Sequence, residues 1–236
     1  RRSVADSVPS RAWTPAARAR RERMMRRDRV RIGIPRVFNM YSYAPLFTGY
    51  LQSLGVPPAN IVFSDQTTTE MYRAGTTRGA IDPCYPSKIA LAHVHNLVLV
   101  KHARHALDYV YFPMVQNLPS PLEGTVGNNA CPTVILTPQT VRAAFTKEGD
   151  LFAQHGVEYL HPLADLDDRR LLLRQMFETW EPILGVSWEE NERAIEAGFE
   201  ALADYDTMIR RAAREALDAL ERENRLGIVL LGRPYH

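Results

Sequence analysis

The stretch Val30-Arg31-Ile32-Gly33-Ile34-Pro35 decides the fold, because it is a short apolar run that follows a polar, basic segment. It begins a pattern in which short apolar runs alternate with longer segments of helical composition. Strands are expected at 30–34, 61–64, 109–112, 157–160 and 228–231, and helices at about 44–54, 67–74, 86–106, 138–148 and 167–180. This alternation is typical of βαβ units. The sequence therefore predicts an α/β fold with a Rossmann-like parallel sheet flanked by helices.

A long helix is expected after the α/β region. Ser187 is followed three residues later by Glu190, which is the capping-box pattern, and apolar residues continue at near-helical spacing to about residue 224. The run Ile228-Val229-Leu230-Leu231 then has the composition of a strand. We divide the chain into a basic linker (1–29), a Rossmann-like lobe (30–182), a long helical segment (183–225) and the first strand of a following lobe (226–236).

Charge is distributed unevenly along the chain. Residues 1–31 contain eleven arginines and three acidic residues, although the net charge of the whole chain is only +2. Runs of charge are usually solvated, and no aromatic residue lies within 18–27. We therefore expect a solvated linker that passes into a basic helix, and no nucleic-acid site.

The composition also bears on the compartment. No apolar run reaches the length of about 18 residues that a membrane span needs. The basic start lacks the apolar region of a secretory signal, and two cysteines cannot form a disulfide framework. We expect a cytoplasmic protein that does not contact a membrane.

The two cysteines of the chain, Cys84 and Cys131, lie in similar local contexts, because a proline follows each of them within two residues. Each is expected just before the first turn of a helix, where N–H groups and the helix dipole stabilise a metal-bound thiolate. The segment 113–130 is rich in Pro, Gly and Asn and is expected to form a long loop that ends at Cys131. It begins at the carboxyl end of a predicted strand, where α/β proteins bind ligands. Small buried hydrophobes are the alternative interpretation.

Other familiar sites are missing from the sequence. It has no phosphate-binding Gly-rich loop, no dinucleotide fingerprint, no His-Glu-x-x-His and no Gly-x-Ser-x-Gly. His93, His95, His102 and His105 lie within one predicted helix near Cys84, so a zinc-binding domain is a further alternative. Solvated or hydrogen-bonded histidines are favoured over it, because Cys-x-x-Cys spacing is missing.

Seven segments of the chain, in this order, resemble parts of one known domain. They are Arg31-Ile32-Gly33-Ile34-Pro35-Arg36-Val37-Phe38-Asn39-Met40-Tyr41, Ser64-Asp65, Cys84-Tyr85-Pro86-Ser87-Lys88, His93-Val94-His95, Asp108-Tyr109-Val110-Tyr111-Phe112-Pro113, Cys131-Pro132 and Gly232-Arg233-Pro234-Tyr235-His236. The domain is found in large bacterial proteins, the CoA-substrate-specific enzyme activases, which are related to the 2-hydroxyacyl-CoA dehydratases and their activators. The resemblance covers about residues 30–236.

This resemblance implies a cofactor and partners. It implies that an ATPase domain, which binds ATP, precedes this domain, and that a dehydratase-like domain follows it. In the related dehydratases, cysteines of Rossmann-like lobes hold a 4Fe-4S cluster, and Cys84 and Cys131 match such ligand positions. Residues beside them become candidates to contact the cluster; these are Tyr85, Ser87, Lys88, Asn128 and Asn129. The implied activity is ATP-driven electron transfer to an acyl-CoA-type substrate.

Two cysteines are fewer than the three or four protein ligands that a cluster usually has. A further ligand would come from beyond His236, from a partner subunit or from a residue other than cysteine. The chain by itself is therefore expected to be inactive. A non-catalytic docking domain, which uses its basic arm and long helix to position neighbours, is the alternative. Whether the protein forms a homodimer is left open.

Overall fold

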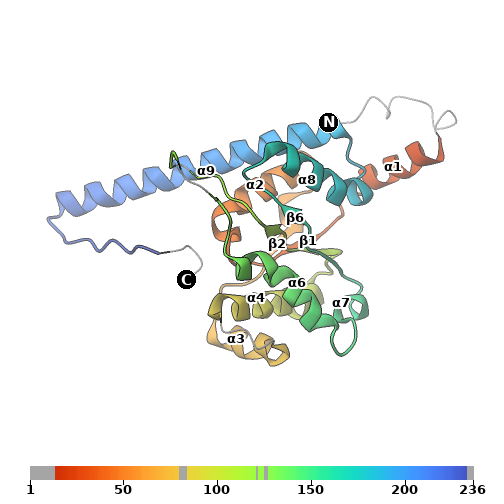
Figure 1. Cartoon of the computed structure of the whole chain (residues 1–236), viewed down its shortest axis with the longest axis horizontal. Helices are drawn as coiled ribbons and strands as arrows, with labels where there is room; N and C mark the ends of the chain where they lie inside the picture. Colours follow the sequence, from red (N-terminus) through yellow and green to blue (C-terminus); the bar gives the residue numbers. More distant parts are fainter. Residues whose placement is uncertain (1–13, 80–83, 121, 125–126, 233–236) are drawn as a thin grey trace.

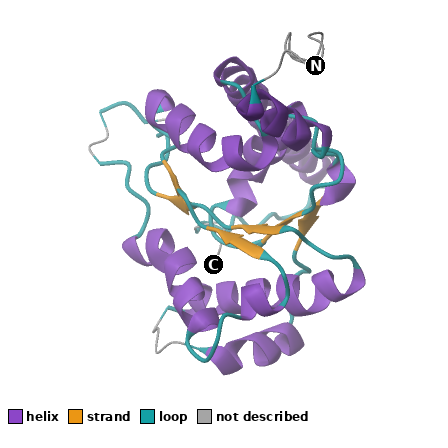
Figure 2. Cartoon of the chain, turned by 90° about the vertical axis from the view of Figure 1, so that its right-hand side faces the viewer, coloured by secondary structure: helices purple, strands orange, loops and turns teal. Residues whose placement is uncertain are grey.

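The computed structural model describes residues 14–79, 84–120, 122–124 and 127–232. It shows a central sheet with helices on both faces (Figures 1 and 2). Four parallel strands form the sheet in the order β2 (Ile61–Phe63), β1 (Ile32–Ile34), β3 (Tyr109–Tyr111) and β5 (Glu158–Leu160). Two short parallel strands, β4 (Met114–Val115) and β6 (Leu163–Ala164), follow β3 and β5 along the chain. The predicted α/β fold with a parallel sheet is confirmed.

The helices form one layer on each face of the sheet (Figure 1). One layer consists of α2 (Met40–Ser53), α8 (Arg169–Leu184) and α9 (Trp188–Arg222), with α1 (Pro15–Met25) beside α8. The other consists of α4 (Tyr85–His95), α6 (Pro132–Thr146) and α7 (Leu151–Gln154), with α3 (Thr69–Gly75) packed on α4. The shorter elements are η3 (Pro58–Asn60), η4 (Thr76–Arg78), the π-helical turn η5 (Asn96–Lys101) and α5 (His102–Arg104).

Alternating residues of the strands contribute to two separate cores. Ile32 and Ile34 of β1 are fully buried in the core beneath α2, α8 and α9. Gly33 between them faces the other core, where a Cβ atom would lie only 2.9 Å from Cδ1 of Leu107 and 3.2 Å from Cδ2 of Leu97. Both faces of the sheet are therefore covered, as is usual for parallel sheets.

Two helices begin earlier than the sequence predicted. α2 begins at Met40 rather than at residue 44, because Met40 and Tyr41 donate their N–H groups to the carbonyls of residues 37 and 38 and so start the helix before Pro45. α6 begins at Pro132 rather than at residue 138, because Pro132 occupies the first helical position. The capping box that starts α9 is confirmed.

The predicted strand at 228–231 is not formed. Residues 226–231 belong to no helix or strand of the described chain, and their apolar side chains are exposed, Ile228 by 96% and Leu230 by 94%. A strand needs a neighbouring strand to satisfy its backbone groups, and the described residues supply none there. The division of the chain into domains stays a prediction.

The first half of α9 packs closely on α2 through glycines. A Cβ atom on Gly198 would lie 2.6 Å from the carbonyl oxygen of Leu46, and one on Gly49 would lie 2.8 Å from Cβ of Ala201. Backbones can approach this closely only where side chains are missing. The second half of α9 extends past the rest of the molecule (Figure 1). The long helix is thus partly a component of the lobe and partly a projection from it.

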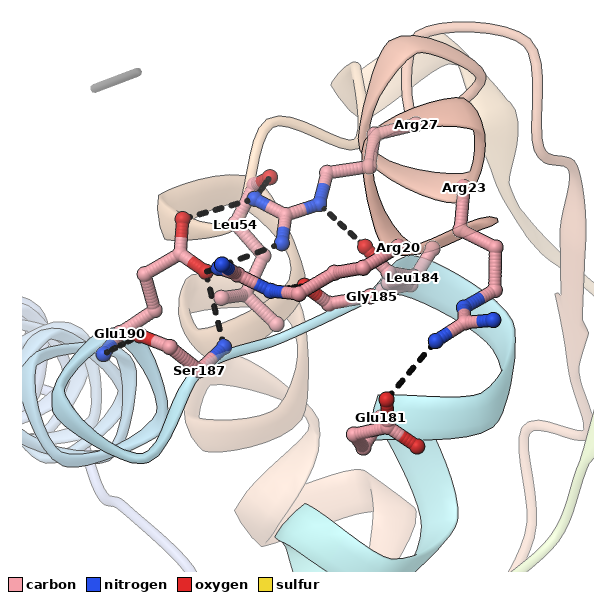
Figure 3. A network of polar contacts seen from close by, with 9 residues as sticks. All are labelled: Arg20, Arg23, Arg27, Leu54, Glu181, Leu184, Gly185, Ser187 and Glu190. Atoms are coloured by element: carbon pink, nitrogen blue, oxygen red, sulfur yellow. Dashed lines mark hydrogen bonds and ion pairs between the residues drawn. The ribbon is translucent and has the colours of Figure 1, made fainter. Parts of the chain in front are cut away.

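A buried carboxylate, Glu190 at the start of α9, receives the side chain of Arg27 (Figure 3). Nη1 and Nη2 of Arg27 each lie 3.2 Å from a different oxygen of Glu190, and its Nε donates to the carbonyl oxygen of Leu184 at 2.7 Å. The side chains of Arg27 and Glu190 are 9% and 8% exposed. This paired geometry is the strongest form of an Arg–carboxylate contact.

Two arginines of α1 complete the network. Arg20 donates to Glu190 at 3.1 Å and to the carbonyl oxygen of Gly185 at 2.9 Å, and Arg23 donates to Glu181 at 2.8 Å. The expectation that the basic linker is solvated is therefore wrong for Arg20, Arg23 and Arg27. The basic run gives no sign of these partners, because they lie more than 150 residues later in the sequence.

Glu190→Gln is expected to lower the free energy of unfolding by about 3 kcal/mol, because Arg27 stays buried without its counter-charge. Gln at this position keeps the capping box, so the helix start itself survives. Glu196→Gln is the matched control on the same helix: its carboxylate is 64% exposed and pairs with Arg169, so the loss should stay below about 1 kcal/mol. Urea denaturation measures both values. Equal losses in the two variants would contradict a buried anchor at Glu190.

Candidate functional site

Cys84 and Cys131 are the N-cap residues of α4 and α6. Their predicted positions just before a helix are therefore confirmed, and both residues are half-buried. α4 leads into β3 and α6 leads into β5, so both helices run against the direction of the parallel strands. Their N-termini consequently lie at the carboxyl edge of the sheet, where α/β proteins bind ligands.

A buried pair of hydroxyl groups joins α4 and α6. Oγ of Ser87 lies 3.1 Å from Oγ1 of Thr137, which itself donates to the carbonyl oxygen of Thr133 at 2.6 Å. Ser87 lies about 5 Å of helix rise after Cys84, and Thr137 about 9 Å after Cys131. The two cysteines therefore lie at the same end of two helices that are in contact. Their role as metal ligands stays a prediction.

Tyr85 and Lys88 lie in the first turn of α4 beside Cys84. The ring of Tyr85 is 58% exposed and contacts the ring of Tyr72, with 5.5 Å between the centroids. Lys88 is half-buried, and its N–H group donates to the carbonyl oxygen of Cys84. The edge beside Cys84 thus offers one exposed aromatic ring and one positive charge.

Asn128 and Asn129 close the loop that delivers Cys131. Asn129 is exposed, and its Nδ2 atom donates to Oδ1 of Asn117 at 2.8 Å. Nδ2 of Asn128 donates to a carboxylate oxygen of Asp167 at 3.3 Å. These bonds hold the loop ends together and fix the start of α6, which is the role that asparagine commonly has in turns.

The described residues do not form a complete metal site. Among the described residues, no group of three or more His, Cys, Asp or Glu side chains is arranged to hold a metal ion. Two thiols are half of the ligands that a 4Fe-4S cluster takes. A cluster would therefore need ligands in addition to those that the described residues bring together.

The zinc site considered from the sequence is not formed by the described residues. His93 is fully buried, with Nδ1 lying 2.7 Å from Oγ of Ser64 and Nε2 2.9 Å from Oγ1 of Thr67. His95 lies at the opposite end of α4 from Cys84, about 16 Å away along the helix. Nδ1 of His102 accepts a hydrogen bond from the backbone N–H group of Leu107 at 3.0 Å, so this nitrogen already has a partner within the fold.

His93 belongs to a polar network that joins the ends of β1 and β2. Oγ of Ser64 accepts the N–H group of Arg36 at 2.7 Å and also contacts His93. Next to it, Asp65 contacts both Asn96 and Lys101, and the hydrogen bond from Lys101 is the largest cause of the lowered pKa of Asp65. This network fixes the strand ends at the edge where both cysteines lie.

Comparison with known proteins assigns the chain to a family. The model of the CoA enzyme activase uncharacterised domain (DUF2229) matches residues 31–236. The chain belongs to this family. Comparison with curated proteins and with solved structures gave no match.

The resemblance to the CoA enzyme activases seen in the sequence is thereby confirmed for this activase domain. Among its described residues, no helix combines the length and the apolar character that a membrane span requires.

Sequence reasoning missed one polar residue at the carboxyl edge of the sheet, Asn39, which precedes α2. Asparagine is common before helices, so its type gave no signal of a separate role.

The stability of this activase domain is expected to fall with pH below about 6.5 because of His93. Burial, helped by the nearby charge of Arg36, lowers the pKa of His93 from 6.5 to about 4. Between pH 6.5 and pH 4, His93 is therefore protonated in the unfolded chain but neutral in the folded chain. The free energy of unfolding falls by about 2 kcal/mol between about pH 7 and pH 5.

Urea denaturation over this pH range measures the loss. In His93→Gln this part of the pH dependence should disappear, whereas the exposed His105→Gln should keep it. An unchanged pH dependence in His93→Gln would show that His93 is not the group responsible.

Proposed function

We propose that this domain supplies Cys84 and Cys131 as two ligands of a 4Fe-4S cluster. The parent protein would be a multidomain, ATP-coupled electron-transfer protein related to the 2-hydroxyacyl-CoA dehydratases and their activators. The observation that carries the proposal is the placement of both cysteines at the N-termini of two contacting helices. Thiolates are the usual ligands of such clusters, and helix N-termini stabilise their negative charge.

The remaining ligands would come from a neighbouring domain of the parent chain or from a partner subunit. The edge beside Cys84 is accessible for such a contact, because the ring of Tyr85 is 58% exposed and Asn129 is exposed on the loop before Cys131. Shared sites of this kind place the metal between two structural units. The fold of this domain would thus present half of a site.

A bound cluster would supply one-electron chemistry at low potential. The residues of this chain would hold it in place. Cys84 and Cys131 would bind iron, the contact between Ser87 and Thr137 would fix the spacing of the two helices, and Lys88 would offset negative charge. ATP would bind to the separate ATPase domain, and the electron acceptor would be an acyl-CoA-type substrate of a cytoplasmic pathway.

A second function, docking of neighbouring domains without a cluster, is favoured by the outer half of α9. Met208 is 60% exposed, and Ile209 and Leu217 are each 49% exposed, although all three are large and apolar. Ile209 and Leu217 are eight residues apart and so lie on the same side of α9, where exposed apolar side chains on a projecting helix suit an interaction surface. Docking does not exclude a cluster, but it is the function that would remain if the domain bound no iron.

The test is the iron and acid-labile sulfide content of the anaerobically purified parent protein, together with its visible spectrum. We expect about four irons and four sulfides for this site. Cys84→Ser and Cys131→Ser should each remove at least half of that iron. Leu136→Ala is the matched control, because it changes a side chain of α6 that is 53% exposed and lies more than one turn after Cys131, so the iron content should stay unchanged.

A colourless parent protein, or iron content that neither cysteine variant changes, would contradict the proposal. Docking would then be the remaining function. In that case, replacing Met208 and Ile209 with serine should weaken the association of the domain with its neighbours, measured by limited proteolysis of the parent protein.

A further inference from the structure

The apolar side of α9 continues beyond the lobe. Gly198, Leu202 and Ile209 are separated by four and seven residues, so they share one side of the helix. At Gly198 this side lies directly against α2, where a Cβ atom would be 2.6 Å from the carbonyl oxygen of Leu46. At Ile209, where α9 extends past the rest of the molecule, the side chain is 49% exposed (Figure 1). The side of α9 that builds the core therefore continues as an exposed surface.

Four apolar residues form this exposed surface, which we call the outer stripe. They are Ile209, Ala213, Ala216 and Leu220, and they follow one another at spacings of four, three and four residues. Both alanines are exposed, and Leu220 is half-buried. A helix with an apolar face gains most of its stability by packing that face against another element. The outer stripe therefore suits a second helix.

The outer stripe is symmetric about its own midpoint, because a large residue lies at each end and two small residues lie between them. In an antiparallel pair of α9 helices with a twofold axis at this midpoint, Ile209 of each copy lies opposite Leu220 of the other. Ala213 of each copy lies opposite Ala216 of the other, so the axes can approach to the lower end of the usual range of about 8–10 Å. The stripe is thus complementary to itself.

Two charged residues beside the outer stripe have the same symmetry. Arg210 and Glu221 are eleven residues apart, which is about three turns, so both lie on the same flank of the stripe. Neither forms an ion pair among the described residues of the chain. In the antiparallel pair, Arg210 of each copy faces Glu221 of the other with an offset of about 3 Å along the axis, which both long side chains can span. A twofold interface requires this kind of self-complementarity.

We infer that the outer stripe of α9 is the interface of a homodimer, in which the α9 helices of two copies pack antiparallel and form two ion pairs between Arg210 and Glu221. The charge pattern favours a second copy as the occupant over the neighbouring domains considered above. The inference does not depend on the iron–sulfur proposal, because α9 lies on the opposite face of the sheet from α4 and α6 (Figure 1). The contact is short, so we expect a dissociation constant in the micromolar range.

Charge reversal tests the inference, with sedimentation equilibrium of the chain measuring the dissociation constant of the dimer. Arg210→Glu and Glu221→Arg each place two pairs of like charges opposite one another, so each variant should dimerise at least about tenfold more weakly. In an equimolar mixture of the two variants, each copy supplies the charges that the other needs. The mixture should therefore regain an affinity close to that of the unmodified chain.

Arg211→Glu is the matched control, because it makes the same charge change on the opposite side of α9, where Arg211 pairs with Glu215 of its own helix. Its dissociation constant should stay within about twofold of the unmodified value. An equal loss in Arg211→Glu and Arg210→Glu, or a mixture that does not regain affinity, would overturn the inference. An unmodified chain that stays monomeric well above micromolar concentration would also overturn it and would leave the outer stripe to a neighbouring domain.

Discussion

The parallel pairing of β1, β2, β3 and β5 is the constraint on which the other features depend. Parallel strands need crossover connections, so the helices between them run back along the sheet and begin at its carboxyl edge. The starts of α2, α4 and α6 therefore lie at one edge, although their residues are separated by up to about 90 positions in the sequence. Cys84, Cys131 and Asn39 are brought to this edge by topology.

Two buried polar networks stabilise the edges of this arrangement. Ser64, Thr67 and His93 join the strand ends to α4, and Glu190 joins α9 to Arg27 after the basic helix. The hydrogen bonds of both networks pair buried polar groups that would otherwise destabilise the fold.

The sequence predicted the sheet, the long capped helix and the helix-start positions of both cysteines, because these depend on local pattern. It did not predict the partners of the arginines before β1, because Glu181 and Glu190 are remote in sequence. It placed the start of α2 too late, because the interior Pro45 resembles a first-turn proline. For α6 it gave two starts, of which Pro132 is right and Pro138 lies inside the helix.

The convergence of Cys84 and Cys131 at one edge of the sheet can be measured without any metal. The native chain is treated with dibromobimane, which becomes fluorescent when it bridges two thiols, and the products are mapped by mass spectrometry. We predict one intramolecular bridge between the peptides that contain Cys84 and Cys131, formed faster in the native chain than in urea. Two separately labelled cysteines in the native chain, with no bridged product, would contradict the account.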